Sequence, residues 1–168
     1  MPGLTIETER LLLRPLKWDD LDAYVAMHAD PRVADWIGGV RTPEETARWL
    51  EARIAAFAEQ EYGHMTVLDR ETGAFLGRCG LTHWEIEGRD ELEVGYGLVF
   101  SAWGHGYATE AARAVRDYAL EELGKTRLIS LVAYANERSA RVALKLGMSH
   151  ERDVEWHGKP HRLFALSR

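Results

Sequence analysis

The sequence has little of what marks an exported or membrane-spanning protein. Its single cysteine, Cys79, cannot form a disulfide within the chain. No apolar run approaches the roughly 18 residues that a membrane-spanning helix needs, and no charged start with an apolar segment behind it resembles a signal peptide. We therefore expect a cytoplasmic protein with no membrane partner.

Clustered basic charge is also scarce. The net charge is -6 at pH 7, the pI is about 5.7, and no stripe of Lys and Arg occurs. Binding to a nucleic-acid backbone needs such a stripe, so we expect no nucleic-acid partner. The acid excess falls mostly in residues 1–84 and favours a cationic substrate. A small anion held by backbone amides stays compatible with this charge, because a helix terminus can bind it.

What the chain does contain is the composition of a globular protein. It has 168 residues, of which 46% are hydrophobic and 29% are charged. No internal repeat, linker or charge block divides the sequence. This length suits one hydrophobic core, so we expect a single domain over residues 1–168.

The hydrophobic periodicity changes along the chain between the helical and the extended pattern. It predicts a strand over 6–16, a helix from Asp19 to Asp30, a second helix that begins at Thr42-Pro43-Glu44-Glu45, a hairpin of HMTVLD and AFLGRCGLTHW, a strand ELEVGYGLVF, a helix over 106–123, a strand over 128–134, a helix over 136–146, and two strands around Gly158-Lys159-Pro160. Strands and helices in this order are typical of an α+β domain.

The strand ELEVGYGLVF has an unusual pattern of faces. Because side chains alternate along a strand, Glu91, Glu93, Gly95 and Gly97 share one face. Two carboxylates and two glycines cannot form an ordinary core surface. This face is therefore a candidate functional site.

A second candidate is the segment from Trp103 to Glu110, between a predicted strand and a predicted helix. Gly104, Gly106 and Ala108 leave its backbone open, and the helix start adds unpaired amides, as in a pyrophosphate site. An ordinary strand-to-helix turn would also use these glycines. A P-loop is excluded because no Gly-Lys-Ser/Thr follows, and the dinucleotide fingerprint fits poorly because Thr109 stands where a third Gly or Ala belongs.

The segment WGHGYATEA resembles the acetyl-CoA loop of the GNAT superfamily of N-acetyltransferases, whose pattern is Gln/Arg-x-x-Gly-x-Gly/Ala. Gly106 and Ala108 match it, whereas Trp103 replaces the first residue, as in the RimJ/RimL-type branch. The segments ETERLLLRPL, ELEVGYGLVF, Asn136-x-x-Ser139 and KLGM resemble the same branch in the same order. The resemblance implies the GNAT fold, a mixed, mostly antiparallel sheet flanked by helices, whose middle strands over 92–100 and 128–134 run parallel and splay apart.

The resemblance further implies direct transfer of acetyl from acetyl-CoA to a primary amine, either a protein N-terminus or a small molecule. It is also compatible with a homodimer. Two other classes stay open from the sequence. One is a non-catalytic acyl-CoA-binding module, since the tyrosine that many family members carry seven residues after the asparagine is Ala143 here. The other, which the fingerprint mismatch disfavours, is a nucleotide-dependent oxidoreductase.

An amine attacks a thioester only when it is neutral, and most amines are protonated at pH 7. The resemblance assigns Glu93 as the base that removes this proton. Glu91 points to the same face, and either carboxylate could instead be solvated or paired with an arginine. The resemblance suggests Ser139 as the acid that protonates the leaving thiolate; a hydrogen bond from Ser139 to the cofactor and protonation by solvent are the alternatives.

The remaining site residues follow from the resemblance as well. Its implied cofactor contacts are the backbone of Leu98, Val99 and Phe100 for the pantetheine arm, the amides of Gly104, His105, Gly106, Tyr107, Ala108 and Thr109 for the pyrophosphate, Asn136 and Ser139 for the arm, and Arg141 together with Arg138 for the adenosine phosphates. Asn136 is also suited to cap the helix that follows it.

The amine groove of the family would be lined here by Trp36 and His83, with His64 on the neighbouring strand. Each of these residues could equally be a packing residue. We expect no metal site, because Gly158 and Pro160 prevent a helix that would bring His157 and His161 together.

Overall fold

A computed structural model describes residues 3–168 of the chain. Eight strands form one sheet in the order β1-β2-β3-β4-β5-β6-β8-β7. They are β1 (Ile6–Glu7), β2 (Leu11–Pro15), β3 (His64–Asp69), β4 (Phe75–Ile86), β5 (Arg89–Leu98), β6 (Arg127–Ala133), β7 (Ser149–Trp156) and β8 (Lys159–Ser167). All neighbours pair antiparallel except β5 and β6, which run parallel at the centre. This is the predicted arrangement.

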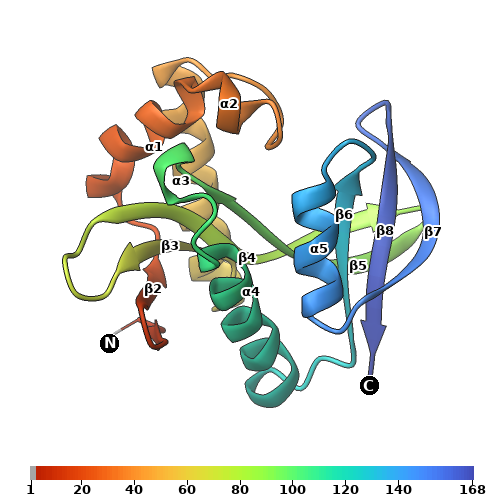
Figure 1. Cartoon of the computed structure of the whole chain (residues 1–168). Helices are drawn as coiled ribbons and strands as arrows, with labels where there is room; N and C mark the ends of the chain where they lie inside the picture. Colours follow the sequence, from red (N-terminus) through yellow and green to blue (C-terminus); the bar gives the residue numbers. More distant parts are fainter. Residues whose placement is uncertain (1–2) are drawn as a thin grey trace.

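The helices are α1 (Leu21–Ala29), α2 (Pro31–Ala34), α3 (Pro43–Gln60), α4 (Tyr107–Asp117) and α5 (Glu137–Lys145), with short helical turns at η1 (Trp18–Asp20), η2 (Phe100–Ala102) and η3 (Tyr118–Glu122). Figure 1 shows α5 beside β6, and the α1–α3 group at the opposite end of the molecule from β7 and β8. Within residues 3–168, none of these helices has the length and apolar character that crossing a membrane requires.

Local signals predicted the α3 start correctly. Glu45 N donates to Thr42 Oγ1 over 3.1 Å, and Thr42 N donates to Glu45 Oε2 over 2.8 Å, so a capping box begins the helix. The single strand predicted over 6–16 is wrong. The chain turns after β1, because Thr8 N donates to Leu11 O and Leu11 N donates back to Thr8 Oγ1, and β1 and β2 form a hairpin.

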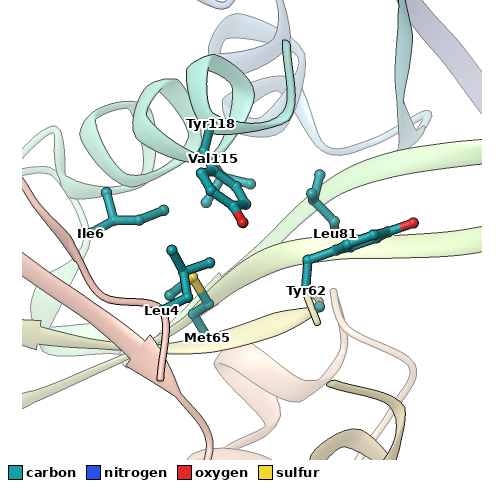
Figure 2. A pocket seen from close by; sticks show the side chains of 8 residues that line it. Leu4, Ile6, Tyr62, Met65, Leu81, Val115 and Tyr118 are labelled. Atoms are coloured by element: carbon teal, nitrogen blue, oxygen red, sulfur yellow. The ribbon is translucent and has the colours of Figure 1, made fainter. Parts of the chain in front are cut away.

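Two apolar layers cover opposite faces of the sheet. Helices α4 and α5 pack their alanines and Val115 on residues such as Leu81 and Val94, whereas α1 and α3 pack on the other face around Tyr24 and Leu50. A small cavity remains under α4, lined by Leu4, Ile6, Tyr62, Gly63, Met65, Leu81, Val115 and Tyr118 (Figure 2). Its volume of about 10 Å³ holds at most one water, so it is a packing void and not a substrate site.

A buried ion pair ties the start of β5 to β6 and β7. Glu91, only 2% exposed, accepts from Arg127 Nε over 2.9 Å, and Arg127 Nη1 also donates to Glu151 Oε2 over 2.8 Å. The alternative in which Glu91 pairs with an arginine is therefore correct. Glu91 serves the fold, which leaves Glu93 as the carboxylate available on this face.

We expect Arg127→Ala to lower the free energy of unfolding by about 3–5 kcal/mol, because it leaves the Glu91 charge buried without a partner. The matched control is Glu151→Gln, which removes the more exposed carboxylate and should cost about 0–1 kcal/mol. Urea denaturation at pH 7 measures both. Equal losses for the two variants would contradict the assignment of Glu91 as the buried partner.

Candidate functional site

The parallel strands β5 and β6 separate almost as soon as they meet. Their only register pair within the described chain is Glu93 with Ile129. Beside it, Ser130 Oγ donates to Val94 O over 2.9 Å and Leu131 N donates to Glu93 Oε2 over 3.0 Å, so side chains replace the next ladder bonds. We call this opening the fork. It confirms the predicted splay of the two middle strands.

Glu93 lies at the closed end of the fork. Its Oε1 accepts from Trp84 Nε1 over 3.0 Å and its Oε2 accepts from the Leu131 amide. Burial raises the pKa of this carboxyl above its usual range, although the two hydrogen bonds and the charges of Arg78 and His161 act in the opposite direction. The carboxylate is thus held in one orientation and is a stronger base than an exposed glutamate.

The two glycines of β5 keep the surface next to Glu93 open. A Cβ at Gly95 would lie 3.3 Å from Glu93 Oε1, and a Cβ at Gly97 would lie 3.1 Å from Ile37 Cγ2. A side chain at either position would therefore crowd the carboxylate or the loop after α2. This explains why glycines share a face with Glu93.

On the opposite face of β5, Tyr96 reaches α5. Its hydroxyl donates to Ser139 Oγ over 2.9 Å, and burial raises the pKa of the phenol. The Ser139 amide donates to Asn136 Oδ1 over 3.1 Å, so Asn136 caps α5 as predicted. The sequence argument missed Tyr96. Strand alternation places it one residue after Gly95 and on the other face, but nothing local indicates a partner 43 residues away.

The loop before α4 is the second part of the site. Gly106 has φ 79° and serves as the N-cap of α4 without a side-chain cap, so the amides of Tyr107, Ala108 and Thr109 have no acceptor within the helix. Arg10 supports the loop: its Nη1 donates to His105 O over 2.8 Å and its Nη2 lies 2.7 Å from Glu110 Oε2. Unpaired amides at a helix start are able to bind an anion.

Trp103 connects the loop to the open end of the fork. Its Nε1 donates to Leu98 O over 3.0 Å, and the Arg138 guanidinium carbon lies 4.7 Å from the centre of the indole. The structure therefore brings Arg138 to the loop. Arg141 lies exposed on the same helix.

The backbone after the fork is only partly free. Val99 N donates to Leu76 O, Ala102 N donates to Val99 O, and Trp103 N donates to Phe100 O. Since alternate residues direct their amides to the same edge of a strand, Tyr96 and Leu98 face the fork with their N–H groups. Within the predicted segment 98–100, the Val99 amide is used by Leu76, whereas the Leu98 amide faces the opening.

Of the two predicted groove residues, His83 lies on the opposite face of the sheet from Glu93. His83 pairs with Leu92 on the opposite face, where its ring nitrogens lie 2.6 Å from Tyr62 Oη and 3.0 Å from Asp90 Oδ1. Trp36 is 45% exposed in the loop after α2, and its neighbour Ile37 is the residue that reaches β5. His64 does share the face of Glu93, with its Nε2 2.7 Å from Thr82 Oγ1.

The described residues 3–168 contain no group of three or more His, Cys, Asp or Glu side chains placed to hold a metal ion. What the site does hold is a basic carboxylate, a strand opening with free amides, and a glycine loop at a helix start. These are the parts needed to bind an extended anionic carrier and to deprotonate a nucleophile beside it.

Known proteins are similar to this chain in sequence and in fold. YkkB of Bacillus subtilis (strain 168) is 33% identical over 156 residues, which cover 91% of this chain and 90% of YkkB. An acetyltransferase of Agrobacterium tumefaciens superposes with a TM-score of 0.86 at 30% identity, covering 100% of this chain and 96% of that one. RimL, a ribosomal alpha-N-protein acetyltransferase solved in complex with coenzyme A, has the same fold, with a TM-score of 0.80 at 17% identity and 98% of each chain covered.

The family model described as "Acetyltransferase (GNAT) domain" matches residues 10–149, which include the fork, Glu93, the glycine loop and Ser139. YoaA of Bacillus subtilis (strain 168), which is named an uncharacterized N-acetyltransferase, is 27% identical over 148 residues. The match covers 87% of this chain and 83% of YoaA. The chain therefore belongs to the GNAT family of acetyltransferases and is an acyltransferase enzyme.

Proposed function

We propose that residues 1–168 form one N-acetyltransferase domain that transfers acetyl directly from acetyl-CoA to a primary amine. The observation that carries this proposal is the carboxylate of Glu93, which burial makes more basic and which lies where β5 and β6 separate. A general base at this point can deprotonate an amine on one side of the sheet while the thioester reaches it through the fork.

In the proposed reaction the amine loses a proton to Glu93, either directly or through one water. The nitrogen forms a bond to the acetyl carbon, and the carbon–sulfur bond breaks to release the thiolate of CoA. The nitrogen gives up its second proton as the amide forms, and the thiolate takes up one proton, so the steps together yield the amide, the thiol of CoA and the one proton that Glu93 accepted. No bond between enzyme and acetyl group forms at any step.

The acyl donor is proposed to lie with its pyrophosphate on the amides of the loop from Gly104 to Thr109 and with its pantetheine arm in the fork. Leu98 and Tyr96 offer amides there, and the Asn136 side-chain NH₂ is available because only its oxygen is used in capping. For the phosphates of the adenosine end, the position over Trp103 favours Arg138 above Arg141.

The Tyr96–Ser139 pair is proposed to protonate the leaving thiolate. When the Tyr96 hydroxyl donates to Ser139 Oγ, the Ser139 proton is free to point at the sulfur. A serine alone is a weak acid, whereas the pair supplies a second hydroxyl that can restore its proton. This arrangement offers a substitute for the tyrosine that Ala143 replaces.

The finer assignment is to the RimJ/RimL-type branch, supported by the WGHGYATEA segment and the shared fold of RimL. That branch acetylates protein N-termini and also small amines, and the acceptor is argued further below. We propose likewise that the protein is located in the cytoplasm and forms a homodimer.

We expect Glu93→Gln to lower kcat/KM by about 10²–10⁴-fold, because the amide cannot accept a proton. In the wild type, activity should rise with pH as Glu93 ionises, with a midpoint above the ordinary glutamate pKa, and this limb should be absent from the variant. Steady-state rates from pH 5 to 9 measure both effects. Glu85→Gln, an exposed carboxylate on β4, is the matched control. Loss of acetyl-CoA binding in Glu93→Gln would instead indicate a structural role.

Ser139→Ala and Tyr96→Phe should both lower kcat while the Kd for acetyl-CoA stays nearly constant. Since the two hydroxyls act as a unit, the double variant should lose about as much activity as Ser139→Ala alone. Single-turnover rates of the four proteins complete the cycle. Independent, multiplicative losses would contradict a linked pair.

Arg138→Ala should weaken coenzyme A binding by about tenfold, which corresponds to about 1.4 kcal/mol. Arg141→Ala should change the Kd by less than about twofold, because Arg141, exposed like Arg138, does not share its contact with Trp103. Titration calorimetry with coenzyme A measures both constants. A larger effect of Arg141→Ala would reverse this assignment.

A further inference from the structure

Three arginines around the Glu93 face each have one buried guanidinium nitrogen without a hydrogen-bond partner. Arg41 Nη1, Arg53 Nε and Arg78 Nε are buried and have no hydrogen-bond partner, and His28 Nε2 beside them has none either. These are four of the five such atoms found among residues 3–168. No carboxylate of the described chain lies within 4.0 Å of the three guanidinium groups, whereas Arg10, Arg14 and Arg127 each have one.

The three arginines come from different elements and share neighbours: the charges of Arg78 and Arg53 act on His64, and those of Arg78 and Arg41 act on His28. Arg41 precedes α3, Arg53 lies on α3, and Arg78 lies on β4 opposite Gly97. The Arg78 guanidinium carbon is 4.0 Å from where a Cβ of Gly97 would lie, and Arg78 Nη1 is 3.3 Å from His64 Nδ1. The missing side chains of Gly95 and Gly97 leave the space between Arg78 and Glu93 free of protein side chains from β5.

The groups packed around Arg78 do not neutralise it. Burial keeps the phenol of Tyr24 and the thiol of Cys79 protonated, since it raises the pKa of both, that of Cys79 to about 12. Burial lowers the pKa of His28 to about 3 and that of His64 well below its usual value, so both rings are neutral at pH 7. Asp20, from η1, accepts hydrogen bonds from Arg14 and Thr66 and so has its charge paired with Arg14.

Two further acids act on the cluster. The negative charge of Glu93 on β5 favours the charged form of Arg78, and that of Glu45 on α3 favours the charged form of Arg41. Each of these two carboxylates lies more than 4.0 Å from its arginine, so Arg78 and Arg41 have no acid in contact with them. An uncompensated charge there is costly, and a bound anion would relieve the cost. The local charge is thus opposite to the acidic balance of residues 1–84.

From this cluster we infer that the amine acceptor is a small molecule that carries an anionic group, a carboxylate or a phosphate, bound by Arg78 with Arg53 and Arg41 behind it. The inference rests on the proposed function for the amine end, which lies at Glu93. Gly95 and Gly97, which mark the two ends of the site, are about 7 Å apart along the strand. The amine and the anion are therefore separated by only a few bonds, as in a short amino acid or an aminoalkyl phosphate.

Arginine suits this task because its planar fork binds carboxylate and phosphate through two parallel hydrogen bonds. Arg78 is also placed over Trp49, with its guanidinium carbon 5.6 Å from the centre of the ring, which limits its motion. A preorganised guanidinium loses little conformational freedom when the anion binds.

The test compares amines that differ only in the anion. β-Alanine is paired with β-alaninamide, 2-aminoethyl phosphate with 2-aminoethanol, and Ala-Gly-amide serves as a neutral peptide N-terminus. Acetyl transfer by the wild type should favour the anionic member of at least one pair by tenfold or more in kcat/KM. The pair that shows this preference identifies the anionic group of the acceptor as a carboxylate or a phosphate. Arg78→Gln should abolish this preference, whereas Arg48→Gln, which replaces an exposed arginine on α3, should keep it.

A second measurement needs no catalysis. Without acetyl-CoA, inorganic phosphate or β-alanine should raise the Tm of the wild type and of Arg48→Gln, an exposed arginine on α3, more than that of Arg78→Gln. Comparing variants cancels the general effect of salt. Should Arg78→Gln not fold, Arg53→Gln replaces it in both assays.

The two measurements keep the inference and the proposed function apart. If neutral amines, Ala-Gly-amide included, are acetylated as fast as anionic ones, the anion site is overturned while the acetyltransferase stands. If no amine in the panel is acetylated but the anions stabilise the wild type through Arg78, the anion site stands and the proposed reaction fails. If no anion stabilises the protein through Arg78 and no preference appears, the inference is wrong.

Discussion

The hydrogen bond between the Leu131 amide and the Glu93 carboxylate is the interaction on which the site depends. A parallel pair of strands would normally continue its ladder here, and the side chain of Glu93 takes the place of the next backbone acceptor. One contact therefore ends the pairing of β5 and β6, satisfies a buried amide, and fixes the orientation of the base. Opening the sheet and placing the carboxylate are a single structural event.

This arrangement gives the two faces of β5 different roles. Because side chains alternate, one strand presents Glu93 and the glycines to one face and Tyr96 to the other, while its backbone faces the fork between them. The amine and its anion can lie on the first face, and the leaving thiolate can meet Tyr96 and Ser139 on the second. Two proton transfers of opposite direction are thereby kept apart by the thickness of one strand.

Much of this architecture could be predicted from the sequence. The Thr42 capping box, the Asn136 cap, and the alternation of Glu93 with Gly95 are local patterns, and the structure contains each of them. The split of the first strand could not be read locally, since Thr8 turns the chain partly through its hydrogen bond to Glu110, 102 residues away.

Features that depend on which side chains meet across the fold are absent from any local pattern. The Tyr96–Ser139 pair, the position of Arg138 over Trp103, and the contact of Arg78 with His64 each join elements distant in sequence. His83 illustrates the same point, because one register position decides whether a residue of β4 faces Glu93 or Leu92. Residue type and spacing locate the strand, but pairing decides what its side chains meet.

Amide hydrogen exchange at Tyr96 and Leu98 tests most directly whether the fork receives the acyl donor. Addition of acetyl-CoA should slow exchange of these two amides strongly and leave the Val99 amide, which already bonds to Leu76, nearly unchanged. Binding of acetyl-CoA that leaves Tyr96 and Leu98 exchanging at their original rates would contradict the account.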